Sequence, residues 1–270
     1  MTYMQLLKLF FGRIDSVLVK RFFFLMTLFI LGACVNTAPS VSSTNRPVSD
    51  KALVHAKLAQ GYLQQKQYAV AKDELERALD INPNHSESHY TMALLMLELQ
   101  QYEETERHFM RAVTTDSSNS EAAHDFGTYL CKTGRERDSV KYFDIAAANP
   151  LFAQSYLSFM RAGECLARIN DVVTAEAYLE RALTINSRLG PALLQLASLK
   201  YDSGEGLSAR AYMQRFLAVN KPQASALLLA YKIESNLRAN DFAEEYRQRL
   251  LEEFPGSQEA REVRFERGER

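Results

Sequence analysis

Residues Lys57–Pro83 read KLAQGYLQQKQYAVAKDELERALDINP, and this stretch decides the fold. It carries a fixed order of residue types: small Ala59, small Ala71, large apolar Leu75, small Ala78, and a proline at the end. The same order returns along the chain. Its first small position falls at Ala59, Ala93, Gly127, Gly163, Ala197 and Tyr231, in steps of 34, 34, 36, 34 and 34 residues. A period of this length indicates stacked structural repeats.

The pattern resembles the tetratricopeptide repeat (TPR), in which each unit is a pair of antiparallel helices. Small residues let the two helices approach closely, and the large apolar residue fills the gap to the next unit. One unit cannot bury its apolar face alone, so units stack. We therefore predict an all-α fold, a superhelical solenoid of about six TPR helix pairs, over residues 51–257.

Three irregularities interrupt the pattern. Thr105 and Ser139 stand where Ala is usual, and the sixth unit is weak because Tyr231 and Arg247 occupy its marked positions. The two extra residues of the 36-residue step fall near Ala147–Phe152, where we expect an enlarged turn or a neutral surface insertion. Residues 258–270 are charged and helix-prone, and we expect them to cap the last apolar face.

Composition narrows the class of protein. The 270 residues are 47% hydrophobic and 24% charged, with a formal net charge of −1. The apolar content excludes a disordered chain, and the balanced charge gives no basic surface for nucleic acid. Among the seven prolines, two lie in the segment before the repeats and the other five lie at unit boundaries, so none interrupts a predicted helix interior.

The N-terminus is predicted to be a secretory signal. Lys20 and Arg21 precede a short apolar run, Phe22–Ala33, and Leu-Gly-Ala then leads into Cys34. This junction resembles a bacterial lipobox, which implies a signal peptide over residues 1–33 and a lipid on Cys34. The alternative is a hydrophobic anchor with a chance cysteine. A later start codon, such as Met4, also remains open.

A flexible tether is predicted to follow the lipid. Residues 34–50 are rich in Ser, Thr, Asn and Pro, without helical periodicity. Residue 35 is Val rather than Asp, which by resemblance to Gram-negative lipoproteins favours the periplasmic face of the outer membrane.

No motif predicts catalysis, a cofactor or a metal site. The chain lacks a Gly-rich phosphate loop and a nucleophile elbow. His85 and His89 have the i, i+4 spacing of a metal pair, but no further ligand stands at a suitable spacing, so we expect surface histidines. The protein is therefore predicted not to be an enzyme and to take no small-molecule substrate.

Two cysteines remain besides Cys34. Cys131 and Cys165 lie 34 residues apart, each on the first helix of its unit, in neighbouring units. In an exported protein a disulfide between them would join the two units. The alternative is a pair of buried thiols.

The concave face is the candidate binding site. By analogy with TPR proteins, positions 2, 5, 9, 12 and 13 of each unit point into the groove. The predicted groove residues of the first three units are Leu53, Leu63, Tyr90, Leu94, Leu97 and His124. Such an apolar patch suits an apolar segment of another protein. The alternative is that the N-terminal linker or helix packing covers these side chains.

A closer resemblance concerns the middle and C-terminal half. The stretches that carry it are AHDFGTYLC at 123–131, AAANPL at 146–151, AGEC at 162–165, AEAYLERAL at 175–183, RAYMQRFL at 210–217, and Phe254-Pro255. Together they resemble the type IV pilus biogenesis/stability TPR lipoproteins (PilF/PilW). The resemblance implies a secretin pilotin: an outer-membrane lipoprotein that helps the pilus secretin to assemble, and so supports piliation and twitching motility. The alternatives are a general periplasmic TPR scaffold for cell-wall or division complexes and a regulatory subunit of an envelope enzyme.

Overall fold

The computed structural model describes residues 46–266, which contain thirteen helices and no strand. The helix pairs form one compact unit from Val48 onward. The helices are α3 (Arg46–Gln64), α4 (Tyr68–Ile81), α5 (Ser86–Glu98), α6 (Tyr102–Thr115), α7 (Ser120–Lys132), α8 (Glu136–Ala148), α9 (Ser155–Arg168), α10 (Val172–Ile185), α11 (Gly190–Asp202), α12 (Gly206–Val219), α13 (Ala224–Asn236), α14 (Asn240–Glu253) and α15 (Gln258–Glu266). None of these helices is long and apolar enough to span a membrane.

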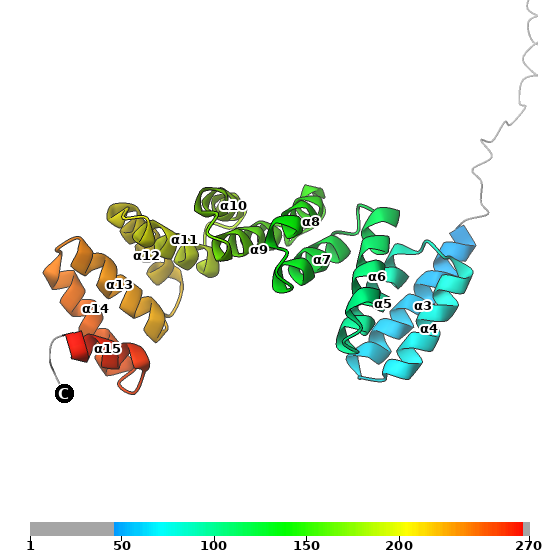
Figure 1. The fold of residues 1–270 in the computed structure, drawn as a ribbon, viewed down its shortest axis with the longest axis horizontal. Helices are drawn as coiled ribbons and strands as arrows, with labels where there is room; N and C mark the ends of the chain where they lie inside the picture. Colours follow the sequence, from blue (N-terminus) through cyan, green and yellow to red (C-terminus); the bar gives the residue numbers. More distant parts are fainter. Residues whose placement is uncertain (1–45, 267–270) are drawn as a thin grey trace, which may run out of the picture. The chain divides into compact units, whose positions relative to one another are not determined.

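The helices follow one another as antiparallel pairs (Figure 1). Pairs such as α5 with α6, α7 with α8, and α9 with α10 make the most extensive contacts, and each second helix also contacts the first helix of the next pair. The predicted all-α stack of about six TPR helix pairs is confirmed. The predicted signal segment, Cys34 and the first part of the tether lie outside the described residues.

The predicted tether is too long at its C-terminal end. We expected residues 34–50 to lack helix, but α3 begins at Arg46. Pro47 permits this because it lies in the first turn of the helix, where the backbone N–H that proline lacks has no partner to lose. The last residues of this Ser- and Asn-rich segment, from Arg46 onward, therefore belong to a helix and not to the tether.

The enlarged turn of the 36-residue step is confirmed. It spans Asn149–Gln154 between α8 and α9, whereas the corresponding turn between α6 and α7 spans only Asp116–Asn119. The Asn149 side chain holds the turn, because its Nδ2 donates to the Ser120 hydroxyl at 3.0 Å and its Oδ1 accepts from the backbone N–H of Leu151 at 2.9 Å.

Small residues at the marked positions allow close packing. A Cβ atom on Gly127 would lie 3.0 Å from the ring of Phe143, and one on Gly163 would lie 2.6 Å from Leu179. Phe143 and Leu179 are both fully buried. The large side chain of the second helix therefore rests directly on the first helix of its own unit, and Phe143 also packs against Ala162 of the next unit.

The two hydroxyl residues at alanine positions are accommodated without unpaired groups. Thr105 and Ser139 are fully buried, and each donates its hydroxyl to a carbonyl oxygen of the preceding turn, Gln101 at 2.9 Å and Glu136 at 2.6 Å. Through these hydrogen bonds each buried hydroxyl group is paired with the backbone of its own helix.

The sixth unit keeps the repeat register despite its weak pattern. The buried residues Ala226 and Leu227 of α13 stand 34 positions after the buried Ala192 and Leu193 of α11. Tyr231 is half-buried, because its ring is larger than the small residue expected there. Arg247 is buried and pairs with Glu244 at 3.2 Å.

Helix α15 covers the end of the stack. Its Ala260 and Val263 are fully buried against Leu227, Leu228 and Leu250 of the last pair. The charged tail thus buries an apolar stripe and leaves its charges outside, as expected for a terminal cap of a repeat array.

Candidate protein-binding site

The predicted groove residues lie on the first helices of the first three pairs. They are Leu53 and Leu63 on α3, Tyr90, Leu94 and Leu97 on α5, and His124 on α7, and all six are half-buried. Tyr90, Leu94 and Leu97 come together against one core cluster, which includes Phe109 and Phe126. Leu63 packs against a different cluster around Leu75 and Leu95. These side chains therefore offer partial apolar surface and not a continuous exposed patch.

Tyr90 is held in place by the next unit. Its hydroxyl donates to Asp125 Oδ2 at 2.7 Å, and its ring lies 6.4 Å from that of Phe109. Burial and the neighbouring Asp125 carboxylate raise the pKa of Tyr90, so the hydroxyl stays protonated. A binding partner would therefore contact a Tyr90 ring whose orientation is already fixed.

His124 is likewise engaged. Its Nδ1 lies 2.8 Å from the Ser158 hydroxyl of the next unit, and its ring contacts Phe143 and Phe152. Burial lowers the pKa of His124, which favours a neutral imidazole near pH 7. The residue therefore links neighbouring units and is only partly exposed.

A hollow lies further along the chain. A cavity of about 670 Å³ lies among α9, α11, α13 and α15. The groove positions of the fifth unit all line it: Pro191, Leu194, Ser198, Tyr201 and Asp202. The positional rule that gives the groove residues of the first three units also gives these five residues when it is extended to the fifth unit.

Cys131 and Cys165 are joined by a disulfide. Their Cα atoms lie 5.9 Å apart, on the first helices α7 and α9. The bond lies in a small cluster with Phe143 and Ala162. Arg168 on α9 adds a second link, because its Nη1 donates to the Cys131 carbonyl oxygen at 3.2 Å. The two-residue insertion between the units leaves this geometry intact.

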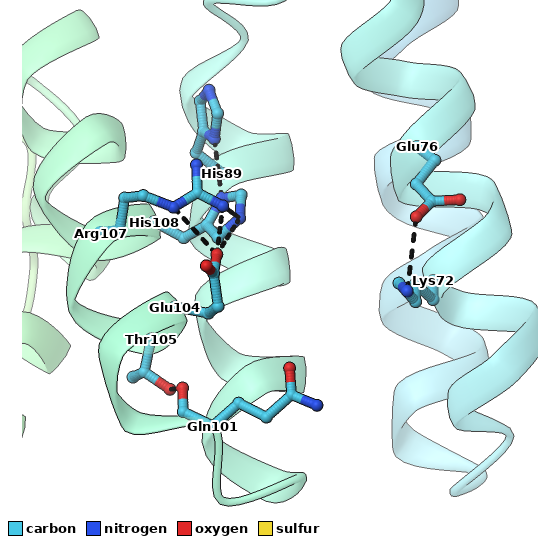
Figure 2. A network of polar contacts seen from close by, with 8 residues as sticks. All are labelled: Lys72, Glu76, His89, Gln101, Glu104, Thr105, Arg107 and His108. Atoms are coloured by element: carbon cyan, nitrogen blue, oxygen red, sulfur yellow. Dashed lines mark hydrogen bonds and ion pairs between the residues drawn. The ribbon is translucent and has the colours of Figure 1, made fainter.

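The expectation of surface histidines is wrong for His89. Figure 2 shows His89 of α5 against His108 of α6, and both rings are buried. Their Nδ1 atoms lie 3.0 Å apart, and His89 Nε2 lies 3.0 Å from the Pro83 carbonyl oxygen. His85 caps the start of α5 instead, where its ring accepts from the Ser88 backbone N–H. The start of α5 is therefore polar, and its Ser86, Ser88 and His89 are buried.

The contacts of the histidine pair assign its protons. Arg107 can only donate, so His108 Nε2, 3.0 Å from its Nη2, must accept. The proton of His108 is then on Nδ1 and donates to His89 Nδ1, and the proton of His89 is on Nε2 and donates to Pro83. Both rings are neutral in this arrangement. A proton added to His89 Nδ1 would face the N–H group of His108 Nδ1. A proton added to His108 Nε2 would face the N–H groups of Arg107.

We expect acid to weaken the fold through this pair. Burial, with Arg107 and His89 nearby, lowers the pKa of His108 from 6.5 to about 4, and burial also lowers that of His89. The unfolded chain therefore binds more protons between about pH 6.5 and 4, and stability falls as pH drops through that window. The lowered pKa of His108 alone corresponds to a loss of about 3 kcal/mol.

Urea denaturation of the wild type and of His108→Gln at several pH values would measure the effect. The variant should lose less stability between pH 7 and pH 4.5 than the wild type. Identical pH profiles would show that the histidine pair contributes nothing to the acid sensitivity.

Among residues 46–266, no three His, Cys, Asp or Glu side chains are placed to hold a metal ion. The predicted groove consists of half-buried apolar side chains and of two polar side chains, Tyr90 and His124, that are hydrogen-bonded to the next unit. Such an arrangement can bind and orient a chain segment.

Comparison with known proteins agrees with the repeat fold. Residues 124–191 match the tetratricopeptide repeat model, and residues 41–112 match the model of anaphase-promoting complex, cyclosome, subunit 3. The chain is 23% identical to the type IV pilus assembly protein PilF of Pseudomonas aeruginosa over 244 residues, which is 90% of this chain and 97% of PilF.

Two solved structures are also similar. PilW, described as a widely conserved type IV pilus biogenesis factor, superposes with a TM-score of 0.62 at 29% identity, covering 78% of this chain and 97% of PilW. The structure of Pseudomonas aeruginosa PilF gives a TM-score of 0.67 at 24% identity, covering 82% of this chain and all of that one.

The stacked helix pairs give this chain a tetratricopeptide repeat fold, and the repeat model matches it over residues 124–191. Over most of its length the chain is homologous to the type IV pilus protein PilF and similar in structure to PilW, which confirms the resemblance seen in the sequence.

Proposed function

We propose that the protein is an outer-membrane lipoprotein that promotes assembly and localisation of the type IV pilus secretin. Pilus biogenesis, adhesion and twitching motility would depend on it. The observation that carries the proposal is the similarity to PilF over 90% of the chain, combined with the sequence junction at Cys34 that resembles a lipobox.

The proposed mechanism is binding and not chemistry. The lipid on Cys34 anchors the protein to the membrane, and the tether connects this anchor to the folded repeats. The half-buried Leu63, Leu94 and Leu97 supply apolar surface for a segment of the secretin. Because Tyr90 and His124 are already fixed by their neighbours, such a segment would meet a preorganised surface and lose little free energy to side-chain ordering.

A general periplasmic TPR scaffold is the second candidate. It draws support from residues 41–112, which match the model of a subunit of a different assembly, the anaphase-promoting complex. In that case the groove would serve a cell-wall or division complex, and loss of the protein would leave the secretin unaffected.

Deletion of the gene tests the proposal. We expect heat-resistant secretin multimers to disappear from gels of outer membranes, with secretin monomer remaining, and piliation to be lost. Restoration by the wild-type gene is the control. Unchanged multimers with normal piliation would refute the pilotin role and leave the scaffold role.

Point variants refine the same test. Leu63→Lys or Leu94→Lys places a charge on the predicted groove, and complementation of the deletion should fall in at least one of them. Leu58→Lys is the matched control, because Leu58 lies on the same helix as Leu63 and is 47% exposed. Circular dichroism verifies folding. Full secretin assembly by both folded groove variants would move the binding surface elsewhere.

A further inference from the structure

The cavity among α11, α13 and α15 forms a trough with an apolar floor, which we call the C-terminal trough. Its floor is made by Leu194 and Tyr201 of α11 and by Leu228 and Leu229 of α13. Three alternate helices shape it, because α13 packs against both α11 and α15 (Figure 1). A volume of about 670 Å³ is enough for one or two large side chains with their backbone.

The rim of the C-terminal trough is acidic. Glu164, Asp202, Glu259 and Glu262 line it, and among residues 46–266 Lys232 is the one cation in the lining. Lys232 and Glu262 form an ion pair at 2.6 Å that crosses from α13 to α15. Three carboxylates then remain around the opening, so the potential above the apolar floor is negative.

An ion pair offsets one of these three charges. Glu164 pairs at 2.8 Å with Arg161. Asp202 Oδ2 lies 3.5 Å from the Ser198 hydroxyl, a neutral group. The acidic character of the opening therefore depends mainly on Asp202 and Glu259.

We propose that the C-terminal trough is a second protein-binding site, which takes a segment with a large apolar side chain flanked by Lys or Arg. The floor accepts the apolar side chain and the rim attracts the cations. Nucleic acid is excluded as a ligand because its phosphates would face the carboxylates. The trough is lined by the fourth to sixth units, whereas the predicted secretin-binding groove belongs to the first three, so this inference does not depend on the pilus role.

The experiment measures peptide binding to the purified full chain in mild detergent by fluorescence polarisation. The probe is a short labelled peptide with a Phe between Lys residues. Comparison peptides carry Glu in place of Lys, or Ser in place of Phe. Neither comparison peptide should bind as well as the probe, and salt should weaken probe binding.

Charge removal on the rim supplies the decisive variant. Asp202→Asn with Glu259→Gln should weaken probe binding roughly fivefold, because two exposed charge pairs are lost. The matched control is Asp73→Asn with Asp80→Asn, which removes two exposed carboxylates from α4 in the first unit. This control should bind like the wild type.

Several results would overturn the proposal. These are absence of probe binding to the wild type, equal binding by the rim variant, and equal binding of the Glu-containing peptide. Concentration-dependent self-association that competes with the probe would assign the trough to a second copy of the chain, and so would also refute it. Secretin assembly is measured separately, so failure here leaves the pilotin role untouched.

Discussion

Replacing Phe143 by Ala is expected to lower the free energy of unfolding by about 3–5 kcal/mol, the usual cost of removing a fully buried aromatic side chain. The ring is completely buried, rests on Gly127 of its own unit and contacts Ala162 of the next. Its loss would leave a cavity at the junction of the third and fourth units. Stability of a stacked repeat depends on such interfaces between neighbours, so the damage should spread beyond one unit.

Urea denaturation followed by circular dichroism would measure the change. Phe242→Ala is the matched control, because it removes the same side chain from α14, where it is 57% exposed. The control should change stability by no more than about 0.5 kcal/mol. Equal losses in both variants would show that burial at the unit junction does not set the contribution of the ring.

Reducing the disulfide between Cys131 and Cys165 is expected to lower stability by about 2–4 kcal/mol, because it releases a constraint on the unfolded chain. The bond closes a loop with a sequence separation of 34 residues. Both sulfur-bearing side chains are nearly fully buried, and Arg168 still links α9 to the Cys131 carbonyl oxygen after reduction. The helix pairs should therefore persist in the reduced protein, with a lower midpoint of unfolding.

Thiol titration and denaturation together check this result. Protein exported to an oxidising compartment should show no reactive thiol from this pair when denatured without reductant. Reductant should shift the unfolding midpoint of the wild type but not that of Cys131→Ala/Cys165→Ala. Two reactive thiols per chain before reduction would contradict the bond.

The repeat pattern predicted most of the fold because it records local and nearest-neighbour packing. Gly127 and Gly163 are small since Phe143 and Leu179 rest on them, and this relation has a constant spacing in the chain. The Asn149–Gln154 turn was visible for the same reason, as a break in the period. The sequence shows that Thr105 and Ser139 depart from the repeat pattern. It does not show how their buried hydroxyl groups are paired, because the accepting backbone carbonyls are known only from the folded helices.

The candidate sites were harder to predict. The positions facing the groove follow from the repeat, but their exposure depends on how neighbouring side chains fill the space. Tyr90 and His124 are tied to Asp125 and Ser158 of following units, which no spacing rule describes. His89 looked like a surface residue because its partner, His108, comes from the other helix of the pair.

Periodicity alone is sufficient for the all-α stack, its unit length and the pairing of neighbouring first helices that brings Cys131 to Cys165. These follow from residue types at regular intervals, because each unit contacts mainly its neighbours. Packing among units decides where the concave face is hollow. The C-terminal trough exists because α15 adds a third wall beyond α11 and α13, and that wall lies outside the repeat. Its acidic rim gathers carboxylates from α9, α11 and α15, which are distant in sequence and come together only when the helices stack.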